Sequence, residues 1–277
     1  MSNCANCGVF ACRNGRLENA PRFCPAHASP EILAEAAQEY NLPATRDIAR
    51  RAAEIEAAGY GRWTRLEEII EFARRSGFQK LGLAFCTGLR KEAAQVAKIF
   101  TAAGFTVFSA ACKTGALPKE ALGIKEEEKV RPGEFEAACN PVAQAKILNA
   151  AGTELNIVLG LCVGHDTLFF RSASAPATVL AVKDRVLAHN PLGALWAEHY
   201  YAEKIAAHAR PVPPGETAGE TAERIKEELR KAASDGRISC TVAHRLADRL
   251  GVPPFAVGAA CNELKIKIKG CELGCFK

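Results

Sequence analysis

The chain lacks the long apolar runs that mark a membrane protein or an exported one. Its longest apolar stretch, residues 157–163, has the length of a β-strand, whereas a membrane helix needs about 18 consecutive apolar residues. The N-terminal sequence MSNCANCGVF has neither the basic region nor the apolar core of a signal peptide. We therefore expect a cytoplasmic protein that does not bind membranes.

No charge of one sign dominates the chain. Its 277 residues hold 36 lysines and arginines against 31 aspartates and glutamates, which gives a formal net charge of +5. This small excess is spread along the chain, so it argues against a dedicated nucleic-acid surface, and DNA is not an expected partner. The apolar and charged fractions, 48% and 24%, are those of an ordinary globular protein.

Cysteine, by contrast, is abundant. The chain has twelve cysteines, which is roughly twice the usage of ordinary intracellular proteins. Disulfides form in oxidising compartments, so they explain this number poorly in a protein that is not exported. Metal ligation or thiol chemistry explains it better.

Four segments follow one another along the chain. The first is rich in cysteine and is expected to bind metal, the second is helical, the third is an α/β domain, and the fourth is a small helical tail unit. They cover residues 1–28, 29–78, 79–210 and 216–277, and a Pro/Gly-rich linker runs through 210–215.

Helix start signals divide the second segment into three helices. Ser29 and Pro30 mark the first start, as N-cap and first helical residue. The second helix is expected at residues 45–59 and the third at 64–77, where Thr64 and Glu67 form a capping box.

Strand-length apolar stretches alternate with amphipathic helices in the third segment. The strands are expected at residues 80–85, 105–111, 155–163 and 178–182, and the helices at 90–103, 141–151, 166–172 and 191–207. Strands separated by helices of this length form parallel βαβ units with right-handed crossovers. The predicted fold class is therefore α/β, with a parallel sheet of about four strands and flanking helices.

Four cysteines stand where the chain leaves the strands of this sheet. Cys86 follows the first strand, Cys112 follows the second, and Cys162 lies at the end of the third. Cys139 stands just before a helix, which places it on the same edge. Ligands of open parallel sheets bind beyond the carboxyl ends of the strands, so the four thiols are expected to converge there.

Four thiolates around one point suit either a [4Fe–4S] cluster or tetrahedral zinc. Iron–sulfur is favoured because the cysteines come singly from four connections, whereas structural zinc sites usually use C-x2-C pairs. The competing interpretation is that these thiols are ordinary core residues, since free cysteine is among the most buried residue types.

Polar residues beside these cysteines are candidates for proton transfer or for holding a small anionic ligand. They are Lys113, His165, Asp166, Lys183 and His189. Two alternatives stay open. Asp166 can instead cap a helix with His165 half exposed, and the loop that contains Lys183 and His189 can be a salt-bridged turn.

A second group of cysteines lies in the first segment. Cys4, Cys7, Cys12 and Cys24 are spaced C-x2-C-x4-C-x11-C. A segment this poor in core-forming residues is expected to need a metal to fold, either an iron–sulfur cluster or zinc. In the rival ligand set His27 replaces Cys12, which gives a zinc-finger-like spacing.

The tail unit contains a long helix followed by a helix-turn-helix-like pair at residues 241–250 and 255–264, and then a short strand. The second helix of the pair is mostly small and apolar, so packing or homodimer formation is favoured over base reading. The tail cysteines offer a further metal site, which this pattern does not decide; they are Cys240, Cys261, Cys271 and Cys275.

Several motifs resemble a family of uncharacterised prokaryotic proteins known only as metal-binding proteins. The motifs are CANCGVFACRNG with FCP, AACNPVAQAKILN, GLCVGHD and KDRVLAHNP, and they extend over residues 1 to about 200. The resemblance implies metal binding by Cys4, Cys7, Cys12 and Cys24 and occurrence mostly in anaerobes. It implies no reaction.

The function predicted from these patterns is that of an iron–sulfur redox protein with one or two clusters. It would transfer electrons, or reduce a small molecule as an oxidoreductase, with an electron-donor protein as partner. The alternatives are a zinc-binding module or metallochaperone, and a metal- or redox-sensing regulator that uses the tail unit.

Overall fold

The computed structural model describes residues 4–208, 218–252 and 254–270. The chain divides into two units, Met1–Asn190 and Pro191–Lys277, which are described separately below. The predicted linker at residues 210–215 lies outside the described residues.

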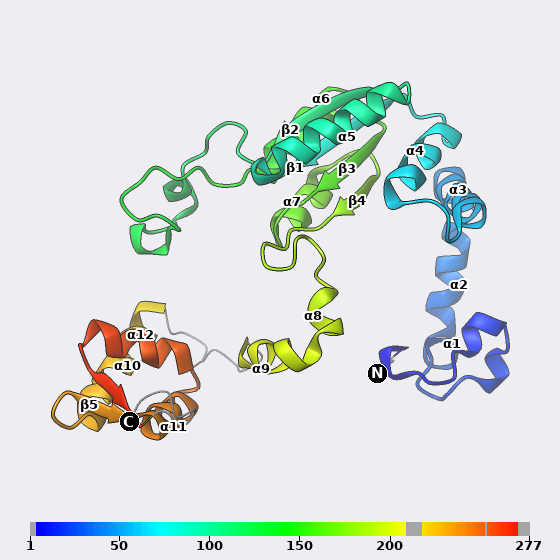
Figure 1. Ribbon diagram of the computed structural model, residues 1–277. Coiled ribbons are helices and arrows are strands. Elements are labelled where there is room, and N and C mark those ends of the chain that lie inside the picture. The colour runs from blue at the N-terminus through cyan, green and yellow to red at the C-terminus, as the bar shows by residue number, and fades with distance from the viewer. Residues whose placement is uncertain (1–3, 209–217, 253, 271–277) are drawn as a thin grey trace. The chain divides into compact units, whose positions relative to one another are not determined.

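A four-stranded parallel sheet forms the centre of the first unit (Figure 1). Its strands are β1 (Lys80–Phe85), β2 (Thr106–Ala111), β3 (Leu155–Leu159) and β4 (Ala177–Ala181), in the order β2-β1-β3-β4. Every residue of β3 is buried, as expected for an interior strand covered on both faces. The α/β class and the four parallel strands predicted from the sequence are confirmed.

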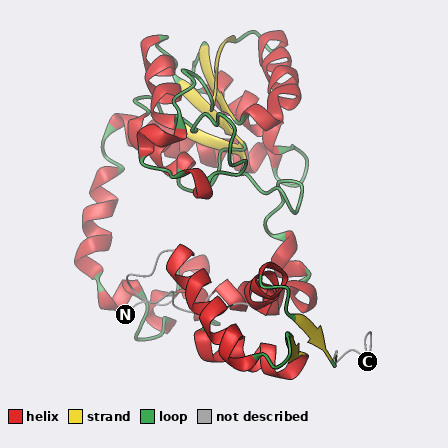
Figure 2. Ribbon diagram, turned by 90° about the vertical axis from the view of Figure 1, so that its left-hand side faces the viewer, coloured by secondary structure: helices red, strands yellow, loops and turns green. Residues whose placement is uncertain are grey.

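Helices cover both faces of the sheet, so the unit has three layers (Figure 2). One face packs against α4 (Arg65–Arg75) and α5 (Arg90–Ala102), with Ile69 and Phe100 in the same core as Leu83. The other face packs against α6 (Pro141–Ala150) and α7 (His165–Ser172), with Leu148 and Phe169 beside Val158.

The strand order has its switch point between β1 and β3, and we call the carboxyl edge of the sheet at this point the crevice. The chain leaves β1, forms α5 and adds β2 on one side, and then returns through α6 to add β3 on the other side of β1. The connections from the carboxyl ends of β1 and β3 therefore diverge. In open α/β sheets this switch point is where ligands bind.

Two elements of the predicted α/β segment differ from their expected bounds by more than one residue. The third strand ends at Leu159 rather than Val163, because Gly160 adopts a left-handed conformation with φ +67° and turns the chain. Glycine is needed there, since a Cβ would overlap the side chain of Leu89. The predicted helix 191–207 is two helices, α8 (Gly193–Trp196) and α9 (Glu198–His208), because Ala197 leaves the helical region at φ −103° and ψ 41°.

The three helices predicted before the sheet are α2 (Pro30–Glu39), α3 (Pro43–Gly59) and α4. The capping box of α4 is confirmed: the Thr64 amide donates to Glu67 Oε2 at 2.7 Å, and the Glu67 amide donates to Thr64 Oγ1 at 3.4 Å. Helix α3 begins at Pro43 instead of Thr45, because proline presets φ for the first helical position.

A long excursion between β2 and α6 was not predicted. It contains two short helices, η5 (Lys119–Leu122) and η6 (Glu126–Glu128), and its buried Lys129 pairs with Glu120 at 2.5 Å and Glu126 at 2.7 Å. The excursion begins beside Cys112 and returns beside Cys139, where the Asn140 amide donates to the Cys112 carbonyl at 2.7 Å.

The N-terminal segment has almost no core. Its elements are η1 (Cys4–Asn6), η2 (Ala11–Asn14), η3 (Leu17–Asn19) and α1 (Pro25–Ala28). Among residues 4–28 only Ala11 is buried, and the apolar side chains of Val9 and Phe10 are both 54% exposed.

The second unit has a separate core. After α8 and α9 it contains α10 (Ala218–Ala232), β5 (Arg237–Ser239), α11 (Cys240–Leu250), α12 (Pro254–Glu263) and β6 (Lys267–Lys269). The helix pair and last strand were predicted; β5, which pairs in parallel with β6, was not. No helix within the described ranges is long and apolar enough to cross a membrane.

The centre of the sheet makes one glycine irreplaceable. A Cβ at Gly82 on β1 would overlap Oδ1 of the fully buried Asn156 on β3. We expect Gly82→Ala to lower the free energy of unfolding by about 3 kcal/mol, because neither neighbour can move out of a packed sheet. Denaturant titration followed by circular dichroism measures the change.

Gly258 in α12 provides the matched control for this substitution. No heavy atom lies within 4 Å of a Cβ built there, so Gly258→Ala should stabilise its own unit by about 0.5–1 kcal/mol through helix propensity. Destabilisation of similar size at both positions would contradict the assignment of Gly82 to a sterically closed site.

Candidate functional site

The four strand-end cysteines lie together at the crevice. Cys86 follows β1 directly, and its amide donates to the Leu159 carbonyl at 3.0 Å. Cys112 follows β2, and Cys139 is held beside it through the bond between the Asn140 amide and the Cys112 carbonyl. Cys162 lies three residues beyond β3, in the loop that Gly160 starts.

Hydrogen bonds and charge connect the four thiols in a row. Cys86 is hydrogen-bonded to Cys112, Cys112 to Cys139, and the charge of Cys162 acts on Cys139. Cys112 Sγ also accepts a hydrogen bond from the amide of Thr87 at 3.3 Å and lies 3.4 Å from its Oγ1. Cys86 and Cys112 are buried, whereas Cys139 and Cys162 are half-buried.

Three of the thiols have a basic side chain beside them. Lys113 is hydrogen-bonded to Cys139 and donates to the Ala137 carbonyl. Arg185 Nη2 donates to Cys162 Sγ at 3.3 Å.

Lys183 faces Cys86 across Gly88. A Cβ built on Gly88 would lie 3.4 Å from Lys183 Nζ and 3.7 Å from Cys86 Sγ. Because the Lys183 amide donates to the Leu161 carbonyl at 3.2 Å, the loops after β3 and β4 run side by side at the crevice.

The surroundings shift the pKa values of two thiols in opposite directions. The hydrogen bond from Cys112 and the positive charge of Lys113 lower the pKa of Cys139 to about 6. The hydrogen bond with Cys112 and burial raise the pKa of Cys86 to about 12. At neutral pH the metal-free site therefore holds a thiolate at Cys139 and a protonated thiol at Cys86.

His165 stands at the start of α7, next to this site. Its Nδ1 is buried and has no hydrogen-bond partner among the described residues. Burial and the nearby charge of Lys113 lower the pKa of His165, so the ring is neutral at pH 7. The alternative in which Asp166 caps the helix is wrong, because Gly164 occupies the N-cap and Asp166 Oδ1 accepts from the amide of Thr167 at 2.8 Å.

His189 shapes the loop after β4 instead of facing the thiols. Its Nδ1 accepts a hydrogen bond from the Asp184 amide at 3.1 Å. Asp184 Oδ1 accepts from the amides of Val186 and Leu187 at 2.9 and 2.8 Å. Side-chain-to-backbone hydrogen bonds thus hold the loop that presents Lys183 and Arg185, and none of its side chains forms a salt bridge with another described residue.

Two contributors were missed by the sequence reasoning. Thr87 and Arg185 both contact cysteine sulfurs. The available signal was position: Thr87 follows Cys86, and Arg185 lies two residues beyond Lys183, just after the fourth strand. Both therefore stand at the carboxyl edge that the fold prediction had already selected.

The described side chains do not surround a single metal ion. Within residues 4–208, 218–252 and 254–270, no three or more cysteine, histidine, aspartate or glutamate side chains are grouped so that they could hold one. A zinc ion needs its sulfur ligands about 2.3 Å from one point. The strand-end thiols are a chain of neighbours and not such a cage.

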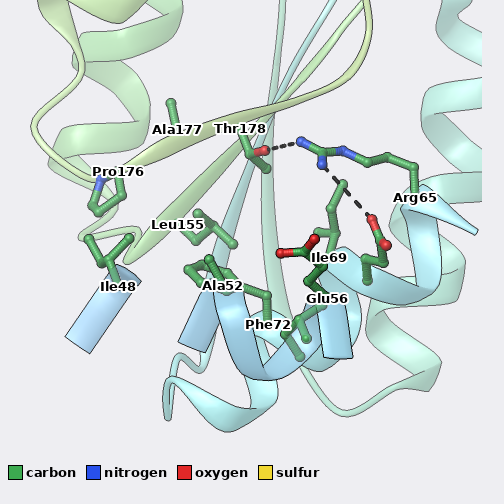
Figure 3. A pocket seen from close by; sticks show the side chains of 12 residues that line it. Ile48, Ala52, Glu56, Arg65, Ile69, Phe72, Leu155, Pro176, Ala177 and Thr178 are labelled. Carbon is green, nitrogen blue, oxygen red and sulfur yellow. Dashed lines mark hydrogen bonds and ion pairs between the residues drawn. The ribbon is translucent and has the colours of Figure 1, made fainter. Parts of the chain in front are cut away.

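A cavity of about 450 Å³ lies at the opposite end of the strands (Figure 3). Helices α3 and α4 and the first residues of β3 and β4, Leu155 and Ala177, line it. Arg65 borders it and donates to Thr178 Oγ1 at 2.7 Å. Because the cysteines stand at the carboxyl ends, this cavity is separate from the thiol site.

The remaining cysteines fall into two groups. In the N-terminal segment Cys4 and Cys12 are exposed, Cys7 and Cys24 are half-buried, and His27 lies in α1, which Cys24 precedes as N-cap.

In the second unit Cys261 is 1% exposed within the core, and burial raises its pKa. Cys240 is half-buried at the start of α11, while Cys271 and Cys275 lie outside the described residues. Cys261 is therefore a core residue.

The unequal thiols predict unequal reactivity in reduced, metal-free protein. Alkylation of Cys139 by iodoacetamide should rise as the pH passes about 6, while Cys86 stays unreactive below about 12. Lys113→Gln should move the Cys139 profile up by about one pH unit, because it removes the charge that stabilises the thiolate. Site-resolved mass spectrometry over a pH series measures both.

Lys98→Gln, on an exposed position of α5, is the control for the loss of one positive charge. It should leave both profiles unchanged. A common pH profile for Cys86 and Cys139 would show that the hydrogen-bonded row of thiols does not exist in solution.

Comparison of the sequence with known proteins identifies the family of this chain. Residues 24–180 match the family described as protein of unknown function, DUF1847. This range contains all four strand-end cysteines and ends before Lys183 and Arg185.

A protein of Methanocaldococcus jannaschii, named as uncharacterized, is 43% identical over 202 residues, which cover 73% of this chain and 97% of the relative. No solved structure matches the chain. Because the family match spans more than half of the sequence, the chain belongs to the DUF1847 family of proteins of unknown function.

Proposed function

We propose that this protein is an iron–sulfur redox protein that holds a [4Fe–4S] cluster on Cys86, Cys112, Cys139 and Cys162. The observation that carries the proposal is the meeting of four thiols, one from each of four separate connections, at the switch point of the sheet. Ligand sites of open parallel sheets lie at this point.

The chemistry of the four side chains fits such a cluster. Each iron of a [4Fe–4S] cluster takes one thiolate, so the four sulfurs belong at separate corners and not around a single centre. The hydrogen-bonded thiols of the metal-free site would have to move apart so that each sulfur could reach its own iron. Cys139 already carries its thiolate near neutral pH.

The cluster would supply one-electron transfer, and the protein would set its potential. Hydrogen bonds to the sulfurs and nearby positive charge both influence the potential of such a centre. Here the Thr87 amide donates to Cys112, Arg185 donates to Cys162, and Lys113 lies beside Cys139. His165 and Lys113 are placed to move protons at the same edge.

An electron-donor protein is the partner that this function requires, and the reducing cytoplasm is the compartment that suits free thiols.

The N-terminal cysteines form a second metal centre in this proposal. A segment in which only Ala11 is buried has too small a core to fix its own fold, so a metal would have to stabilise it. Cys4, Cys7, Cys12 and Cys24 are the proposed ligands of a second cluster. Zinc, with His27 in place of Cys12, is the alternative, and it would make the segment a structural or metal-transfer module.

The regulator hypothesis has weaker support from the second unit. In α12 the side chains of Val257, Ala260 and Cys261 are buried in the core of that unit. Asn262 and Glu263 remain exposed, and a glutamate is a poor contact for a phosphate backbone.

Removing two strand-end thiols tests the main proposal. Protein purified without oxygen should contain about eight irons and eight acid-labile sulfides per chain if both centres hold [4Fe–4S] clusters. The double variant Cys112→Ser, Cys139→Ser should lose about half of each, with a matching fall in visible absorbance. Iron, zinc and sulfide analysis with a visible spectrum makes the measurement.

Cys261→Ala is the matched control, because it removes a buried thiol of the second unit. Its iron content should equal that of the wild type. Full iron and sulfide content in the strand-end double variant, or zinc without iron in the wild type, would overturn the assignment of a cluster to these four cysteines.

The N-terminal centre predicts protection from protease. With metal bound, trypsin should cut slowly at Arg13, Arg16 and Arg22, and Cys7→Ser or chelation should speed cleavage at least tenfold, because the segment then loses its fold. Comparing Cys12→Ser with His27→Ala identifies the fourth ligand, since only its loss should remove metal. Equal cleavage with and without metal would contradict a structural centre here.

A further inference from the structure

The basic side chains of the thiol site have no carboxylate in direct contact within the described residues. Lys113, Lys183 and Arg185 form no ion pair with any aspartate or glutamate in the described part of the chain; the contacts of Lys113 and Arg185 go to a carbonyl and to sulfurs. The carboxylates of the adjoining loops are already engaged. Asp166 accepts from the amide of Thr167, and Asp184 accepts from two amides of its own loop.

A bound cluster would take up part of this positive charge, because its iron and sulfide core offsets only about half of the charge of four thiolates. The donors of Arg185 that do not contact Cys162 would stay available to an anion. Basic side chains gathered at a crevice raise the local concentration of anions.

Gly88 places no side chain between two of these groups. Gly88 has no side chain between Lys183 Nζ and Cys86 Sγ, and a Cβ there would contact both, at 3.4 and 3.7 Å. Its φ is not positive, so the backbone does not require glycine at this position. The missing side chain keeps the approach to the amine and the thiol clear.

His165 adds a polar atom at the same edge. The charges of Lys113, Asp166 and Arg185 act on its ring, so it lies near these side chains. Its Nδ1 is buried and unpartnered among the described residues, and buried polar atoms of native proteins normally have a partner. A ligand at the crevice would provide one.

We propose that this crevice binds a small oxyanion, held by Lys183 and Arg185 beside Gly88. The guanidinium of Arg185 uses one N–H on Cys162, so four of its five donors remain for a planar or tetrahedral oxyanion. Lys183 supplies a point charge. The inference names the ligand class of the proposed redox site and rests on that site, although binding needs only these side chains.

Binding of inorganic phosphate and of sulfate tests the inference on the full chain, by isothermal titration calorimetry at constant ionic strength set with sodium chloride. We expect Lys183→Gln and Arg185→Gln each to weaken binding roughly tenfold or more, because each removes a charge-assisted contact. Gly88→Ala should weaken it as well by filling the space, without removing any charge.

Lys98→Gln is the matched control, because it removes one exposed positive charge on α5. Its affinity for either anion should equal that of the wild type. Equal affinity in all four variants, or no measurable binding by the wild type, would overturn the oxyanion site.

Iron and sulfide content of the same samples separates this inference from the proposed function. If Arg185→Gln weakens anion binding at least tenfold while the protein keeps its iron, both proposals are supported. Anion binding to a wild type that contains no iron overturns the cluster and leaves the oxyanion site standing. Iron at the strand-end cysteines without anion binding overturns the oxyanion site alone.

Discussion

The candidate site depends on the hydrogen-bonded position of β1 between β2 and β3. That pairing sets Cys86 beside Cys112 on one side and beside the loop of Cys162 on the other. The fully buried amide of Gln144 secures the arrangement from α6, because its Nε2 donates to the carbonyls of Phe85 and Ala110 at 3.2 and 2.7 Å. The Gln144 side chain thus connects the ends of β1 and β2 to α6, the helix that follows Cys139.

Charge and hydrogen bonding determine which thiols of the crevice are ionised. Buried thiols without a partner favour the protonated form, but here they hydrogen-bond to one another and to the Thr87 amide, and cations stand beside them. The two thiols therefore differ in protonation at neutral pH: Cys139 is ionised and Cys86 is not. Thiolates with hydrogen-bond donors and nearby cations are the groups that the proposed metal cluster and the proposed oxyanion would use.

Regular elements were predictable because their signals are local. The period of β1, the capping box at Thr64 and the prolines that start α2 and α6 can be read within a few residues. The excursion that carries Cys139 back to the sheet was not predictable, since its ion pairs around Lys129 join residues without periodicity. Arg185 was missed because its contact with Cys162 crosses between two loops.

The sequence by itself determined the α/β class, the four strands, the excess of cysteine and the placement of single cysteines at strand ends. Each of these follows from composition or from spacing along one stretch of chain. Only the tertiary structure decided which thiols contact one another, which cation accompanies which sulfur, and that His189 supports a loop while Arg185 faces the site. The contacts among the thiols and their cations join residues 23 or more positions apart, which the strand order and the left-handed turn at Gly160 bring together and which no local pattern encodes.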